Sequence, residues 1–223
     1  MLFPEAKDAG GTTYREGIVR VPSCREHNEA FSLDDEYFCA VMTMGEGTNQ
    51  IGNTQFVTKI MRAMTLSKGL AGAVLRDVRV SGAGGEEDTA TFAIDLDRWE
   101  RSIRKLTAGL YHHVTGHRLP DWTIMTVVSP DLALEGARLR PYARIRGYID
   151  SLTQWRELRS GPPDVYRARH IIDPLRMRHF VFEHVFYGGV RAWVVSAPED
   201  ALWTPLCGAR GGVASTSLPG GPE

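Results

Sequence analysis

Apolar residues at helical spacing predict two helices in the first part of the chain. The first is expected over residues 32–44, where the recurring apolar positions are Leu33, Tyr37, Phe38, Val41, Met42 and Met44. Ser32 and Asp35 form a capping-box pattern at its start, and Gly45 is a plausible stop. Residues 46–55 are expected to form a polar loop. A second helix follows from residue 56, with Phe56, Ile60 and Met64 inward and Val57 and Met61 beside them.

The longest helix is predicted over residues 97–115. Its apolar stripe consists of Trp99, Ile103, Leu106, Leu110 and Val114. Arg98, Arg101, Arg104 and Lys105 make a basic face on the other side. Asp97 is expected as the N-cap and Gly116 as the residue that ends the helix.

Alternating apolar and polar residues predict strands at several places. The expected strands are 18–21, 74–80, 90–96, 123–128, 165–172, 180–186 and 190–196. The last two flank Tyr187-Gly188-Gly189 and form the clearest hairpin of the chain. The remaining stretch from 129 to 165 has no clear period, although residues 151–160 suggest a short helix.

These elements predict an α+β protein. A partial zinc-knuckle element of ββα type is expected at residues 1–45. An antiparallel-sheet domain with two or three helices is expected at residues 46–207, and a disordered Gly- and Pro-rich tail at 208–223.

The composition excludes several classes of protein. The net charge of −1 gives no overall attraction to nucleic acid or membrane. The chain has only three cysteines, an odd number that does not suit a disulfide framework. This sparse use of cysteine favours a reducing compartment. The N-terminus lacks the features of a signal peptide, and no apolar run reaches the roughly 20 residues of a membrane helix. We expect a cytoplasmic protein without a membrane partner and without a motif for a small-molecule cofactor.

Arginines are concentrated in the second half of the chain. The candidate nucleic-acid-binding residues are Arg138, Arg140, Arg144, Arg146, Arg167 and Arg169. Aromatic residues such as Tyr148 and Trp155 lie between them, and this mixture suits a phosphate backbone or a single strand. The alternative is a solvated basic face on strands and loops.

Cys24 and His27 are two residues apart, the spacing of one edge of a tetrahedral zinc site. The alternative is a buried thiol beside a surface imidazole. A second candidate, His112, His113 and His117, falls at the end of the long helix. Cationic side chains there also complement the helix dipole, so the histidines need no metal to explain them.

Three stretches carry a resemblance to a known family. VPSCREHNEAFSLDDEYF resembles the second half of the zinc-knuckle, or treble-clef, module of bacterial HNH-endonuclease-like proteins. RSIRKLTAGLYHHVTGHRLP is similar to the long helix of that family, and HVFYGGVRAWVV is similar to its closing hairpin.

The resemblance implies roles for a few residues. Cys24 and His27 would hold zinc, and Asn28 would stand at the catalytic position that can bind a divalent metal in an active enzyme. The general-base His of the family would fall on Met1, so the module is catalytically incomplete as given. Either the reading frame begins too late or the module has decayed.

Two functions follow from these observations. The first is an HNH-endonuclease-like, DNA-associated protein without the catalytic His. The second is a non-enzymatic interaction module that uses the helix at 97–115 and the terminal hairpin as its partner surface.

Overall fold

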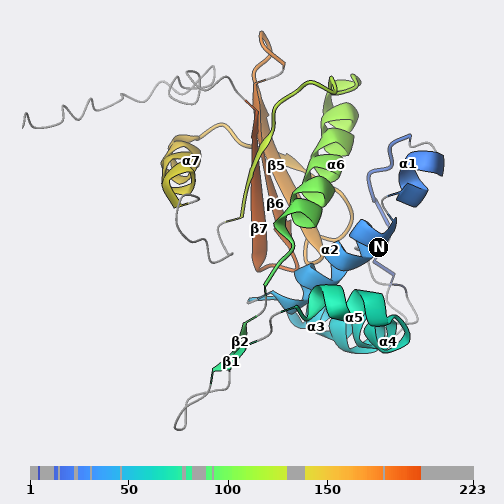
Figure 1. Ribbon diagram of the computed structural model, residues 1–223. Coiled ribbons are helices and arrows are strands. Elements are labelled where there is room, and N and C mark those ends of the chain that lie inside the picture. Colours follow the sequence, from blue (N-terminus) through green and yellow to red (C-terminus); the bar gives the residue numbers. More distant parts are fainter. Residues whose placement is uncertain are drawn as a thin grey trace, which may run out of the picture.

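A five-stranded antiparallel sheet forms the centre of the protein. The computed structural model describes residues 5, 13–14, 16–22, 25–30, 32–45, 47–76, 79–81, 89–91, 93–129, 139–177 and 179–196. The strand order is β3-β7-β6-β5-β4. The strands are β3 (Thr126–Val128), β4 (Arg156–Leu158), β5 (Tyr166–Ile172), β6 (Phe180–Phe186) and β7 (Val190–Ser196). Helices lie on both sides of this sheet (Figure 1), so the predicted α+β class is confirmed.

Successive residues of strand β6 point to opposite faces of the sheet. Phe180, Phe182 and Phe186 point into the main core, whereas Val181 belongs to a second cluster on the opposite face. This alternation follows from the two-residue period of a strand. We call these faces the inner and outer face. The expected strands at 165–172, 180–186 and 190–196 are confirmed, the last two residue for residue.

Helices α2 (Ser32–Met44) and α6 (Leu96–Thr115) cover the inner face. The predicted bounds of α2 are confirmed, but Leu33 is 70% exposed and takes no part in the core. Asp95, rather than the predicted Asp97, caps α6 by accepting the Arg98 N–H. Gly116 ends the helix in the left-handed conformation, as predicted.

A run of short helices packs beside the end of the sheet (Figure 1). It comprises α3 (Gln50–Gln55), the π-helical turn η2 (Phe56–Ile60), α4 (Met61–Leu66) and α5 (Lys68–Val74). The expected loop at 46–55 was wrong because the Asn49 side chain accepts two backbone N–H groups and starts a helix at Gln50. Ile60 and Met64 are buried as predicted, but Val57 and Met61 are exposed. The wider π turn rotates the helix face at this point.

Helix α7 (Leu139–Ser151) covers part of the outer face, where Ile145 and Ile149 pack against the sheet. The expected helix at 151–160 was wrong, because only Ser151, the last residue of α7, is helical and residues 156–158 form strand β4. The predicted hairpin in the middle of the chain is present but short, with β1 (Arg79–Ser81) paired to β2 (Thr89–Thr91). The strand at 74–80 was wrong in its first part because α5 continues to Val74.

The N-terminal part of the described chain holds α1 (Arg25–Ala30). Residues 18–21 do not form the predicted strand; the Val19 N–H instead donates to the Ser160 hydroxyl after β4. The main core joins residues from α2, on one side of the predicted boundary at 46, to residues of α6 and the sheet. Among the helices that the structure describes, none has the length and apolar character needed to cross a membrane. The tail at 208–223 lies outside the described residues.

Candidate functional site

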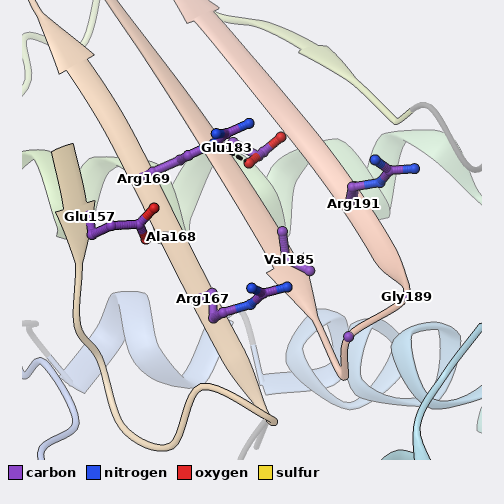
Figure 2. Close-up of a pocket in the computed structure, with 9 residues that line it drawn as sticks. Glu157, Arg167, Ala168, Arg169, Glu183, Val185, Gly189 and Arg191 are labelled. Carbon is purple, nitrogen blue, oxygen red and sulfur yellow. Dashed lines mark hydrogen bonds and ion pairs between the residues drawn. The ribbon is translucent and has the colours of Figure 1, made fainter. Parts of the chain in front are cut away.

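A groove of about 370 Å³ lies on the outer face of the sheet, beside the part that α7 covers. Strands β4, β5, β6 and β7 contribute its floor and sides, and the turn between β6 and β7 closes one end (Figure 2). Its charged side chains are Glu157, Arg167, Arg169, Glu183 and Arg191. Three arginines therefore face two glutamates in this groove.

Two arginines flank the floor at the same level of the sheet. Arg167 on β5 pairs in register with Val185 on β6, and Val185 pairs with Arg191 on β7. Neighbouring strands are roughly 4.8 Å apart, so the two arginine Cα atoms are separated by about 9.6 Å. Figure 2 shows their side chains extending from either side of Val185. This arrangement places two guanidinium groups on the same face of the sheet, and guanidinium groups bind anionic oxygens.

The third arginine is held differently. The Arg169 Nε donates to the Glu183 carboxylate, and this pair is marked in Figure 2. The Arg169 guanidinium also lies over the Trp155 ring, 4.3 Å from the ring centroid. The second oxygen of Glu183 accepts the Trp193 indole N–H at 2.9 Å. The charge of Arg169 is thus balanced by the carboxylate of Glu183, whose side chain is only 10% exposed.

The turn between β6 and β7, which closes one end of the groove, is held by contacts with residues 49–55. Tyr187 and Gly188 both have positive φ, as the two central residues of a type I′ turn require, and the Gly189 N–H donates to the Phe186 carbonyl at 3.1 Å. The Tyr187 hydroxyl donates to the buried Gln55 side chain of α3 at 2.9 Å. The Asn49 N–H donates to the Tyr187 carbonyl at 2.8 Å. The helical run therefore fixes the turn that closes the groove.

The structure brings some of the predicted arginines together. Arg167 and Arg169 both line the groove. Arg146 lies next to it on α7, where its guanidinium packs 5.2 Å from the Trp193 ring and pairs with Asp150. The backbones of Arg140 and Arg144 belong to α7, and Arg138 falls outside the described residues.

The expected metal-binding residues are only partly covered by the structure. Cys24 lies outside the described residues, and α1 begins directly after it. His27 and Asn28 are part of α1, so their backbone is helical. Among the described residues, no three His, Cys, Asp or Glu side chains are grouped as metal ligands would be. The zinc site and the role of Asn28 therefore stay predictions.

The other polar clusters found in the sequence have structural partners. Asp34 accepts hydrogen bonds from Arg98 and Arg101, and Asp35 pairs with Lys105. The basic face of α6 is thus engaged with α2, and both sides of the terminal hairpin pair with other strands. These contacts reduce the surface that the interaction-module hypothesis would use.

Sequence reasoning missed Glu183 and Arg191, which lie in the correctly predicted hairpin. The signal was present, since they are polar residues at outward positions between inward apolar ones. We compared the chain with protein-family models, curated proteins and solved structures, and found no match.

Proposed function

We propose that the protein binds nucleic acid in the outer-face groove and that Arg167 and Arg191 contact its phosphates. The observation that carries this proposal is their placement opposite one another across Val185, on a face that α7 leaves uncovered. Arginine forks suit phosphate oxygens, and phosphate contacts position a nucleic-acid chain on a protein surface.

The HNH-endonuclease-like, DNA-associated role expected from the sequence is compatible with this proposal and remains part of it. In that case the described sheet domain would supply binding, and the module around Cys24, His27 and Asn28 would supply a zinc-stabilised element. We also propose a cytoplasmic location, which the sparse cysteines support. Replacing Cys24 by Ser tests the zinc element: we expect less zinc in the purified protein, and an unchanged content would remove it.

Binding is best measured by fluorescence anisotropy of a labelled short single-stranded DNA with the full chain at several salt concentrations. Each phosphate contact adds about 0.7 to the slope of log affinity against log salt for a single strand. We therefore expect Arg167→Ala and Arg191→Ala each to weaken binding and to reduce the slope by about 0.7.

Arg176 provides a matched control, because it is exposed in the turn between β5 and β6, beyond the opposite ends of those strands from the groove. Arg176→Ala should leave affinity and slope unchanged. A poly-glutamate chain of equal charge serves as a competitor without phosphates or bases. Absence of binding at low salt, equal behaviour of all three variants, or equal competition by poly-glutamate would each overturn the proposal.

A further inference from the structure

Arg169 is fixed in the groove by two neighbouring side chains. Its Nε is held by Glu183, and its guanidinium plane packs over Trp155. The side chain nevertheless remains 35% exposed and lines the groove. A planar group with one side against an aromatic ring and with exposed surface in a groove is a preformed stacking surface.

We propose that Arg169 is a platform on which an unpaired base stacks, so that the groove selects single-stranded nucleic acid. This inference rests on the proposed function, because it assigns the base of the same ligand whose phosphates Arg167 and Arg191 hold. Arginine planes and aromatic rings are the surfaces on which proteins stack the splayed bases of single strands.

The neighbours of Arg169 favour a role in base stacking rather than in binding phosphate. Glu183 already compensates its positive charge, and Trp193 holds the other oxygen of that carboxylate. A bound phosphate would gain little from a guanidinium that is paired in this way. Arg167 lies two residues along the same strand, so a strand of nucleic acid can place a phosphate near Arg167 and a base over Arg169.

The bases of a duplex are stacked on one another and cannot reach such a platform without being flipped out. Arg169 is in register with Glu183, and Glu183 is in register with Trp193, which belongs to the cluster that α7 covers, so the platform lies beside the covered part of the face. The bases of a single strand are not held in a duplex and can stack on the platform without that cost.

The first test uses the unmodified protein and two single strands of equal length, one with normal bases and one with abasic sites. Both carry the same phosphates, so phosphate contacts alone would give equal affinity. We expect the abasic strand to bind at least about fivefold more weakly, with the same salt slope, and the matching duplex to bind more weakly than the normal strand. Equal affinity for the normal and abasic strands, or preference for the duplex, would overturn this inference.

The second test uses the paired variant Arg169→Leu with Glu183→Gln, which removes the platform and its counter-charge together. The carbonyl oxygen of the introduced glutamine can still accept the Trp193 indole N–H. Here we expect the normal and abasic strands to bind alike, with the salt slope of the unmodified protein. A reduced slope would show that Arg169 contacts phosphate and would contradict the inference.

The two proposals fail in different ways. If the proposed function is wrong, neither strand binds, or Arg167→Ala has no effect. If only the stacking platform is wrong, both strands bind equally and Arg167→Ala still lowers the slope. Circular dichroism of the paired variant verifies its fold, and the abasic comparison needs no variant.

Discussion

The Tyr166 hydroxyl lies 2.7 Å from the His184 Nδ1 in the core, on the opposite face of the sheet from the groove. The other ring nitrogen, Nε2, lies 3.0 Å from the Thr107 hydroxyl, which itself donates to the Ile103 carbonyl. Thr107 must therefore accept from Nε2–H, and Nδ1 must accept from Tyr166. This pairing assigns the neutral tautomer of a histidine that is fully buried.

Burial lowers the pKa of His184 to about 3, whereas an unfolded histidine titrates near its ordinary value of 6.5. Between these two values the unfolded chain binds a proton that the folded chain does not. The free energy of unfolding should therefore fall as the pH is lowered through this window, by on the order of 1 kcal/mol per pH unit.

His184→Gln tests this origin of acid sensitivity, because an amide can donate to Thr107 and accept from Tyr166 without titrating. We expect urea unfolding at pH 7 and pH 5 to differ less for this variant than for the unmodified protein. His113→Gln, at an exposed position near the end of α6, should keep the full pH dependence. If all three proteins respond equally, His184 is not the group responsible.

The contact between α2 and α6 depends on Asp34. Burial alone would raise the pKa of Asp34, but the hydrogen bonds and charges of Arg101 and Arg98 outweigh it and lower that pKa. The carboxylate is therefore favoured in the folded state, and its contribution is lost as the pH falls below the ordinary value of 3.8.

Asp34→Asn should reduce the free energy of unfolding by about 1 to 2 kcal/mol at pH 7, because the amide keeps only one acceptor oxygen: one arginine loses its hydrogen bond, and both lose the negative charge. Asp121→Asn is the control, since Asp121 pairs with Arg118 at 2.8 Å in an ion pair whose side chains are both more than four-fifths exposed. Chemical denaturation should show no measurable change for that variant. An equal loss in both would mean that burial of the Asp34 pair contributes nothing.

The correctly predicted parts of the fold are those with strong local signals. The hairpin at 180–196 combines strict alternation with Tyr187-Gly188-Gly189, and α6 carries a long apolar stripe that ends at Gly116. Helix α3 was missed because its start depends on a cap at Asn49 within a polar stretch. That stretch also bonds to Tyr187, far along the chain, which no local pattern reveals.

The candidate site was found only in part for a similar reason. The arginine-rich stretch indicated Arg167 and Arg169, but not that Glu183 would neutralise one of them. Asp35 was likewise assigned to a capping box at the start of α2, whereas its partner Lys105 lies on α6. Pairings between distant strands and helices decide which charges remain available for a ligand.

The turn that closes the groove leaves no space for a side chain at Gly189. A Cβ atom there would lie 2.4 Å from the Gly47 backbone, closer than real atoms approach. Gly189→Ala must displace one of the two loops, and we expect it to lower both the free energy of unfolding and the affinity for single-stranded DNA. The cost should be in the range of about 1 to 3 kcal/mol, as for other overpacked sites.

Gly72→Ala is the matched control. Gly72 is exposed in α5, and a Cβ atom there would meet nothing within 4 Å among the described residues. Alanine favours a helix over glycine by roughly 0.5 to 1 kcal/mol, so this variant should be slightly more stable. Thermal unfolding measures the stability of both variants. Equal changes in Gly189→Ala and Gly72→Ala would show that the contact between residue 189 and Gly47 is not tight.

Glu157 is the one exposed carboxylate among the described residues that line the groove, and Figure 2 places its side chain on the β4 side. Its negative charge opposes the binding of an anion between Arg167 and Arg191. Glu157→Gln should therefore tighten binding of single-stranded DNA by roughly two- to fivefold at low salt, with the gain shrinking as salt is added. Glu36→Gln, on the exposed side of α2, removes a charge of the same sign from the opposite side of the sheet and should leave affinity unchanged. Anisotropy titrations of the two variants separate a local effect from one of net charge, and an equal gain in both would argue against a ligand in the groove.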